Sequence, residues 1–292
     1  MGKRNFTKIK PYIYVMPIVV FVLAITFLSM GQSLKQSFGI YEQIGLTKFT
    51  TKYYREILKS KEFIDSLKFT FGYSISSSVI SIFLGTVLAF YLKAKKDKYV
   101  MDMIQLGIIL PHMIVGVLIY QMLGQTGLIS RIMYDVGIIK NFEQFPSFVY
   151  DKNSIGIVIA FVFKEMAFVG YTMSSVLMRI SDEYKSQAYL LGANKVQTFF
   201  KVTLPMIFSN IVYCFVVIFT YTFSSYELPV ILGPSYPKTL SEISMIYYTS
   251  AEMEDHLYSM VINNILLLIG AIGFVIFCIS YNKMISEEAN YE

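Results

Sequence analysis

The chain has 292 residues, of which 55% are hydrophobic and only 15% are charged, and its formal net charge is +5. Soluble domains usually carry about 25% charged residues, so this composition excludes an ordinary soluble protein. The apolar residues gather in several runs of about 20 residues, the length that crosses a hydrocarbon core of roughly 30 Å. We therefore predict an all-α protein that crosses a membrane several times.

The first predicted span covers about residues 11–30. The apolar run is too long for the hydrophobic region of a cleavable signal, and no small-x-small cleavage site follows it. We therefore expect it to be a retained span at the periphery of one membrane domain, residues 1–292. The basic residues that precede the span are Lys3, Arg4, Lys8 and Lys10.

Five further spans follow in the sequence. They are predicted at about residues 67–92, 100–123, 154–178, 206–232 and 259–281. Pro111 interrupts the third. Six spans place both termini on one side of the membrane, and the four lysines between residues 93 and 98 mark that short loop as cytoplasmic by the positive-inside rule. The prediction is a membrane protein with both termini in the cytoplasm (N-in, C-in).

The segments predicted on the outer side are not simple linkers. Residues 41–66 and 128–150 mix charged and apolar positions, a pattern typical of short amphipathic helices. The last outer loop is acidic, because it contains Glu252, Glu254 and Asp255.

The cytoplasmic segment 180–205 differs from the other loops. Asp182 and Glu183 favour a helix start, because acidic residues are stabilised at the positive end of the helix dipole. Gly192 predicts a break, and Pro205 is suited to the first turn of the next span. The pattern predicts a short helix, a break, a second helical stretch and a stop.

This segment resembles the EAA loop of the permeases of binding-protein-dependent ABC importers. In that loop Glu-Ala-Ala is followed after three residues by Gly-Ala, then by Phe, an aliphatic residue and Leu-Pro. The matching residues are Ala188, Gly192, Ala193, Phe199, Val202, Leu204 and Pro205. Ser186 stands in place of the Glu, Gln187 in place of the first Ala, and Ser209 in place of a later Pro. Glu183, one helical turn earlier, is the alternative source of the missing carboxylate.

The resemblance extends over a core of about residues 65–285, and it implies a protein of a bacterial inner membrane. It also implies a six-helix fold of the type I importer class, in which this loop docks on a cytoplasmic ATPase. It also implies a dimer of permeases, with a heterodimer favoured over a homodimer, two ATPase subunits and an external solute-binding protein. The chain has no G-x-x-x-x-G-K-[ST] phosphate loop. ATP and Mg²⁺ are therefore expected on the partner ATPases, and this chain is expected to be no enzyme and to need no cofactor. Membrane lipid is an expected partner, and nucleic acid is not.

A second stretch, residues 225–240, resembles the end of the fifth span in permeases for polyamines, ferric iron, thiamine, sulfate or phosphonates. Polyamine is the favoured solute, because Glu227 and the acidic last outer loop suit a cation. Ferric iron, thiamine and phosphonate are the alternatives within this class of importer. An alternative from another class is a secondary transporter or channel subunit, which would show ionisable relays and often an inverted repeat.

Ionisable groups inside a span are costly and usually face a cavity or a partner. The candidates for the translocation path are Lys164, Glu165, Tyr226, Glu227, His112 and Asn263. For Lys164 a structural or gating role is the alternative, for Glu227 an interfacial carboxylate, and for His112 a satisfied buried histidine. No metal site is predicted, because Cys214 and Cys278 lie in apolar stretches and suit small buried thiols.

Overall fold

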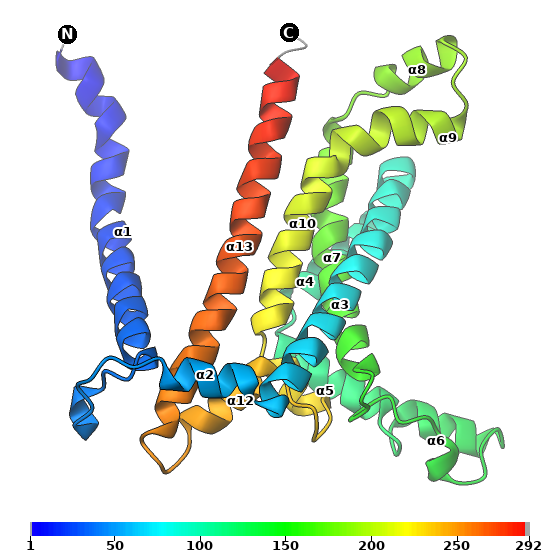
Figure 1. Cartoon of the computed structure of the whole chain (residues 1–292). Coiled ribbons are helices and arrows are strands. Elements are labelled where there is room, and N and C mark those ends of the chain that lie inside the picture. Colours follow the sequence, from blue (N-terminus) through cyan, green and yellow to red (C-terminus); the bar gives the residue numbers. More distant parts are fainter. Residues whose placement is uncertain (1, 290–292) are drawn as a thin grey trace. The chain divides into compact units, whose positions relative to one another are not determined.

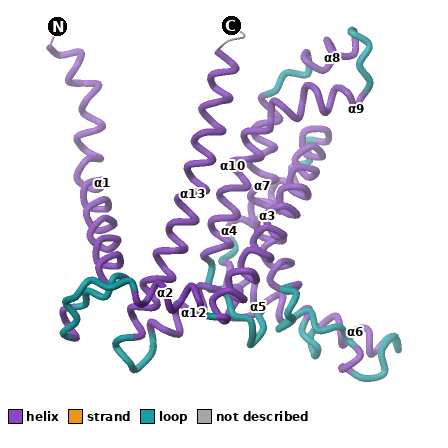
Figure 2. The backbone as a smooth tube through the Cα atoms, viewed as in Figure 1, coloured by secondary structure: helices purple, strands orange, loops and turns teal. Residues whose placement is uncertain are grey.

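The computed structural model describes the backbone of residues 2–289 and the side chains of residues 14–279, 281 and 282. The regular secondary structure of this part of the chain is helical, apart from one isolated β-bridge between Tyr41 and Leu46 (Figures 1 and 2). Six helical segments are long and apolar enough to cross a membrane, namely Tyr14–Ser37, Lys61–Lys95, His112–Asp135, Ile155–Arg179, Lys195–Ser224 and Asp255–Ile279. The predicted all-α architecture with six spans is confirmed.

The helices follow one another with short connections. In chain order they are α1 (Gly2–Ser37), η1 (Glu42–Ile44), α2 (Lys52–Lys59), α3 (Lys61–Lys95), α4 (Lys98–Ile109), α5 (His112–Leu123), α6 (Leu128–Asp135), η2 (Phe142–Gln144), α7 (Ile155–Arg179), α8 (Glu183–Leu190), α9 (Lys195–Thr198), η3 (Phe199–Thr203), α10 (Leu204–Ser224), α11 (Glu227–Leu232), α12 (Leu240–Tyr248) and α13 (Asp255–Ala289).

The chain divides into two compact units. One consists of the residues up to Ser60 together with Ser244–Ile265, and the other consists of Lys61–Ile243 together with the residues from Leu266 onward. The single membrane domain and the peripheral first span remain predictions.

In the smaller unit, the apolar side chains of the first span between residues 14 and 28 are exposed. The span is joined to α13 by Ser33, whose hydroxyl lies 3.3 Å from Oδ1 of Asn264. Helix α2 buries Tyr53 and Ile57 on one face, so the amphipathic helix predicted within residues 41–66 is confirmed.

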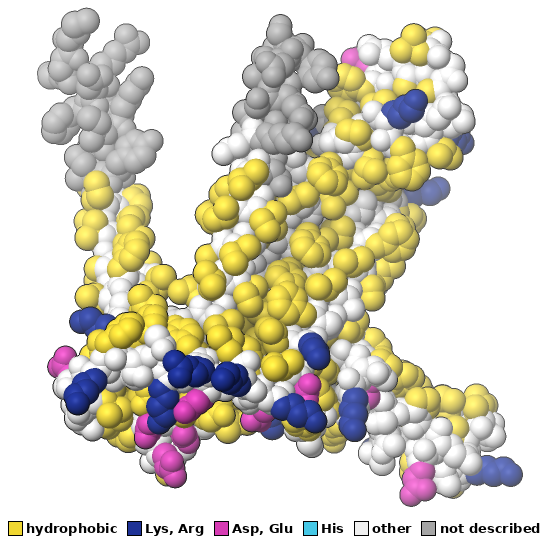
Figure 3. Space-filling view, in the orientation of Figure 1, with side chains coloured by type: hydrophobic (Ala, Val, Ile, Leu, Met, Phe, Trp, Pro, Cys, Tyr) yellow, Lys and Arg dark blue, Asp and Glu magenta, His cyan; other side chains and the backbone are white. Residues whose placement is uncertain are grey.

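In the larger unit, α3 and α7 pack side by side, with α4 and α10 against them. Small residues let the first two helices approach closely: Ser74, Ser77 and Ser81 of α3 are buried, and a Cβ added to Gly85 would lie 2.5 Å from Cβ of Val169. Small side chains at helix interfaces are typical of membrane bundles, where close packing replaces the hydrophobic drive. Figure 3 shows apolar side chains over α3 and α10 between the two ends of this unit.

The third span differs from the prediction in its bounds. Instead of one interrupted helix at 100–123, α4 ends at Ile109, α5 starts at His112, and the apolar segment continues through α6 to Asp135. The interruption itself lies where predicted. Pro111 has no N–H and its ring excludes a continuing helix, and Leu110 before it is extended, with φ −61° and ψ 127°.

The fifth span also differs, at both ends. Its helix starts at Lys195 and ends at Ser224, so the stop predicted before Pro205 is absent. A π turn, η3, connects α9 to α10, and the N–H of Leu204 donates to the carbonyl of Phe199. This wider turn lets the helix pass a proline that cannot donate to the carbonyl four residues earlier.

Candidate functional sites: a surface loop and a polar cavity

The segment 180–205 folds into two short helices joined by a tight turn. Helix α8 ends in a Schellman motif: the N–H of Ala193 donates to the carbonyl of Ala188 at 3.0 Å, and that of Gly192 to Tyr189 at 3.0 Å. Gly192 adopts φ +84°, the left-handed conformation that this motif requires. The predicted break is therefore confirmed, and glycine is the residue type that makes it.

The start of α9 holds two polar residues that the sequence analysis missed. Oδ1 of Asn194 accepts from the N–H of Gln197 at 2.9 Å, and Oε1 of Gln197 accepts from the N–H of Asn194 at 2.9 Å. This is a reciprocal capping box. The Asn-x-x-Gln spacing directly after a helix-ending glycine is the signal that could have identified it.

The turn between these helices presents apolar side chains to the outside. Leu190 is 88% exposed and Leu191 is 89% exposed. Glu183, Ser186, Gln187 and Gly192 are also exposed, and Ala188 and Ala193 are half-buried. The two helices stand at the end of the larger unit opposite α6 (Figure 1). Leu190 and Leu191 therefore form an exposed apolar pair at the tip of a well-capped turn.

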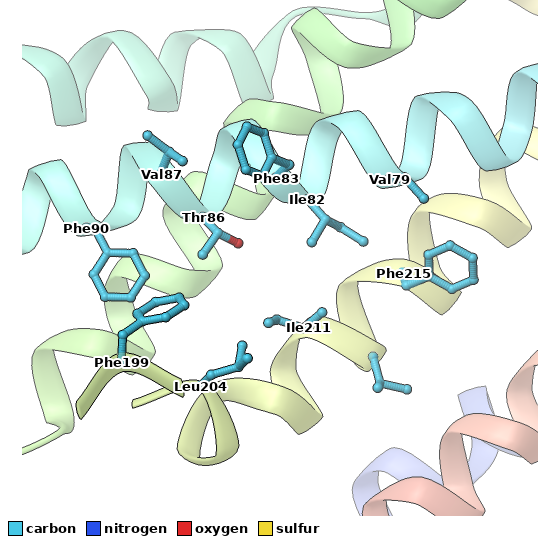
Figure 4. Close-up of a pocket in the computed structure, with 11 residues that line it drawn as sticks. Val79, Ile82, Phe83, Thr86, Val87, Phe90, Phe199, Leu204, Ile211 and Phe215 are labelled. Carbon is cyan, nitrogen blue, oxygen red and sulfur yellow. The ribbon is translucent and has the colours of Figure 1, made fainter. Parts of the chain in front are cut away.

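Further along the same segment, Phe199 packs inward, with its ring centroid 5.8 Å from that of Phe90 on α3. Leu204 and Pro205 form the first turn of α10. Phe199 and Leu204 also line an open apolar cavity of about 650 Å³ between α3 and α10 (Figure 4). Its lining contains no ionisable side chain, so this cavity is suited to hydrocarbon and not to polar chemistry.

A smaller cavity of about 250 Å³ brings together three of the candidate path residues. It is lined by Ile108, His112, Lys164, Glu165, Phe168, Val217 and Tyr221. Nε2 of His112 lies 3.1 Å from Oε1 of Glu165, and the ring of His112 lies 4.6 Å from that of Tyr221, centroid to centroid. Lys164 and Glu165 are both buried in the chain.

Tyr221 is a member of this cavity that the sequence analysis missed. Helix α10 carries it one turn before Ser225, and it is one of 23 tyrosines in the chain. No local pattern distinguishes it, because its place in the cavity depends on how α10 packs against α7.

The other three candidates lie elsewhere. Glu227 and Tyr226 are exposed, and Glu227 starts the separate helix α11 after the break at Ser225; the prediction that Glu227 lies within the fifth span is wrong. Asn263 belongs to the smaller unit, where its Oδ1 accepts from the Ser244 hydroxyl at 2.8 Å.

A third cavity, of about 500 Å³, lies in the larger unit beside the start of α3 and of α7. Asp65, Lys68, Lys152 and Tyr236 contribute polar groups to it, and the Tyr236 hydroxyl donates to Oδ2 of Asp65 at 2.6 Å. The Asp65 carboxylate raises the pKa of Tyr236 above its ordinary value. Among the residues whose side chains are described, no cluster of three His, Cys, Asp or Glu groups could hold a metal ion.

Comparison with known proteins identifies the relatives of this chain. The Probable ABC transporter permease protein YurN of Bacillus subtilis is 27% identical over 286 residues, covering 91% of this chain and 93% of the relative. The Sulfate transport system permease protein CysT of Synechocystis sp. is 27% identical over 145 residues, which are 49% of this chain and 47% of the relative. The chain thus matches only about half of the length of that protein.

The fold has a close counterpart among solved structures. A chain of a bacterial ABC transporter involved in the import of the acidic polysaccharide alginate superposes with a TM-score of 0.72 at 17% identity, covering 97% of this chain and 98% of that one. Similarity at this identity concerns the fold alone, and it confirms the predicted importer-permease fold.

The family assignment comes from the sequence of the core. The family described as binding-protein-dependent transport system inner membrane component matches residues 81–285. This match confirms the inner-membrane location and the role as a permease component that is not itself catalytic, and it decides against a secondary transporter or channel subunit. The chain belongs to the family of binding-protein-dependent transport system inner membrane components.

Proposed function

We propose that this chain forms half of the translocation path of an importer, that residues 180–205 couple it to a separate ATPase, and that the imported solute is a polyamine. The complex would contain a second, different permease, two ATPases that bind ATP and Mg²⁺, and an external binding protein. Alternating access then moves the solute through the cavity lined by His112 and Glu165.

The exposed turn between α8 and α9 carries the coupling proposal. Leu190 and Leu191 offer apolar surface on the segment whose first residue, Ile180, accepts a hydrogen bond from Lys93, the first of the four lysines of residues 93–98. Lysine-rich short loops face the cytoplasm, which is the side where an ATPase would bind. Ser186 replaces the usual Glu, and we assign the polar contact of that position to Glu183, which is exposed on the first turn of α8.

Two glycine substitutions test this proposal. Gly192→Arg adds bulk, charge and backbone strain to the turn, so the complex should lose co-purifying ATPase and solute-stimulated ATP hydrolysis. Gly137→Arg is the matched control, because Gly137 has φ +78° and, like Gly192, open space where a Cβ would lie. Equal loss of ATPase binding in both variants would mean that strain alone is responsible and would contradict the coupling role.

The polyamine proposal is supported by carboxylates near the candidate path. Glu227 is exposed at the start of α11, and Glu165 lines the polar cavity. Support from the last outer loop is weaker than expected, because the Glu254 carboxylate is already bonded to Lys52 and to Tyr53. The polyamine proposal therefore rests on Glu227, which is exposed, and on Glu165, which shares the polar cavity with His112.

An oxyanion such as sulfate is the second candidate solute. One relative is named as a sulfate permease, and two lysines, Lys68 and Lys152, line the polar cavity of about 500 Å³. A lysine ammonium supplies charge-assisted donors to an oxyanion.

Uptake of labelled spermidine and of labelled sulfate by cells that express the whole transporter separates these candidates. For a polyamine, Glu227→Gln should lower spermidine uptake about tenfold, as expected for loss of one hydrogen bond to a charged group. Glu252→Gln, in the last outer loop, should leave uptake unchanged. Saturable sulfate uptake that Lys152→Gln abolishes, with no spermidine uptake, would overturn the polyamine proposal.

A further inference from the structure

The break between α4 and α5 leaves backbone groups without helical partners inside the membrane-spanning unit. Pro111 has no N–H to donate to the carbonyl of Gly107, which lies four residues earlier. Non-helical backbone at membrane depth is tolerated only where protein groups or a water-filled cavity satisfy it. The break therefore requires a donor from another element.

Lys164 of α7 supplies that donor. Its Nζ lies 3.1 Å from the carbonyl oxygen of Gly107, 2.6 Å from that of Ile108 and 2.5 Å from that of Leu110. An ammonium group has three donors, so these three carbonyls match its capacity. The carboxyl end of a helix also carries partial negative charge that favours a cation. Only 7% of Lys164 is exposed, and the described ion pairs of the chain do not include it.

The next residue of α7 holds the other side of the break. Glu165 lies 3.1 Å from Nε2 of His112, which is the first residue of α5. The positive amino end of α5 favours a carboxylate nearby. Two consecutive residues of α7 thus contact the two helix ends that Pro111 separates. The positive Lys164 binds the carboxyl end of α4, and the negative Glu165 lies at the amino end of α5.

We propose that Lys164 is a positioning residue of the translocation path: by binding the last carbonyls of α4 it fixes where α5 begins, and so places His112 opposite Glu165 in the cavity. Lys164 itself does not contact the solute, because its three donors are used by backbone carbonyls. The contact with the solute is left to Glu165 and His112. This inference stands whichever solute the transporter carries.

The test measures the relative placement of α4 and α5 directly. In the complete transporter, with Cys214 and Cys278 replaced by alanine, spin labels are placed at the exposed residues Met103 of α4 and Met122 of α5. Pulsed electron paramagnetic resonance then gives the distribution of their separation. Lys164→Met should shift or broaden this distribution beyond its original width, and Lys164→Arg should preserve it, because a guanidinium group also donates several hydrogen bonds.

Glu165→Gln is the matched control, because it removes the charge of the neighbouring residue, keeps an oxygen that can accept from His112, and leaves the Lys164 ammonium in place. It should keep the Met103–Met122 distribution while it weakens solute transport. If Lys164→Met does not assemble, Lys164→Gln replaces it, since the amide donates two hydrogen bonds and should broaden the distribution partly. An unchanged distribution in Lys164→Met or Lys164→Gln would overturn the proposal. A raised KM for spermidine or sulfate, whichever the wild-type transporter takes up, would then assign Lys164 to direct solute contact. The distance measurement needs no solute. A negative result for Lys164 can therefore be told apart from a negative result for the polyamine proposal.

Discussion

Lys93 at the end of α3 binds Asp182, the residue before α8, with 3.2 Å between Nζ and Oδ1. The same ammonium donates to the carbonyl of Ile180 at 3.0 Å. Lys93 and, at 3.4 Å, Lys185 hold the pKa of Asp182 below its ordinary value. The segment that we propose to couple to the ATPase is therefore tied to the helix that packs most extensively against α7.

We expect Lys93→Met to reduce solute-stimulated ATP hydrolysis by the assembled transporter, because movement of α8 would no longer be transmitted to α3. Asp182→Ala should have a smaller effect, since the bond from Lys93 to Ile180 remains. The comparison is made on reconstituted complex with equal amounts of bound ATPase. If both variants lose ATP hydrolysis equally, the ion pair between Lys93 and Asp182 accounts for the whole effect, and the hydrogen bond to Ile180 contributes nothing.

The contact between α2 and the last outer loop should respond to acid. Hydrogen bonds from Tyr53 and Lys52 lower the pKa of Glu254. A lowered folded-state pKa means that the stabilisation is complete above the unfolded value of about 4.3 and is lost as the pH falls through the folded value. Amide hydrogen-exchange protection of α2 should therefore be constant from neutral pH down to about 5 and fall below about 4. Glu254→Gln should show no such fall.

The contact between α2 and the last outer loop should also weaken at alkaline pH, in this case as the pH rises. Burial, followed by the hydrogen bond to Glu254, raises the pKa of Tyr53 to about 12. A raised folded-state pKa gives stabilisation that is complete below the ordinary tyrosine value of about 10 and is lost as the pH rises through the folded value. Protection of α2 should decline above about pH 10 in the wild type, and Tyr53→Phe should abolish that decline.

A single methyl group added at Gly85 should destabilise the interface between α3 and α7. A Cβ at Gly85 would meet Val169 Cβ at 2.5 Å and the carbonyl of Met166 at 2.9 Å, so we expect Gly85→Ala to destabilise the complex by about 1–3 kcal/mol. Gly72→Ala on the same helix is the control, because nothing lies within 4 Å of its added Cβ. Thermal unfolding of the purified complex measures both. Val169→Gly removes both the Cβ at 2.5 Å and the Cγ1 at 2.7 Å, so it should partly restore the Gly85→Ala variant. Failure to do so would locate the clash at the Met166 backbone.

The π turn before α10 should depend on its proline. Pro205→Ala restores an N–H that can donate to the carbonyl of Lys201, so we expect η3 to become α-helical and α9 to rotate by about 100° about the helix axis, the angle of one residue. Phe199 would then leave Phe90. Cysteine cross-linking between residues 90 and 199 should be efficient in the otherwise wild-type chain and lost with Pro205→Ala. Retained cross-linking would show that packing, and not the proline, maintains the turn.

Much of the fold could be predicted from local features of the sequence. The length and apolarity of the runs predict six spans, because only helices of that length satisfy their backbone in a hydrocarbon core. The turn at Gly192 and the break at Pro111 follow from the conformational limits of glycine and proline. Both are decided within a few residues, so no knowledge of neighbouring helices is needed.

The site depended on tertiary structure. His112 and Glu165 are 53 positions apart, and Tyr221 is further still; only the packing of α5, α7 and α10 brings them to one cavity. The sequence marked Lys164 as a costly charge in a span but left open whether it binds solute or serves the structure, because its partners are backbone carbonyls that carry no sequence signal. The sequence analysis placed Glu227 inside the fifth span because the apolar run continues past Ser225. The helix ends at Ser224, and this end is set by packing rather than by the apolar pattern. Apolar length determines how often this chain crosses the membrane, and the contacts between its helices determine which polar groups meet inside.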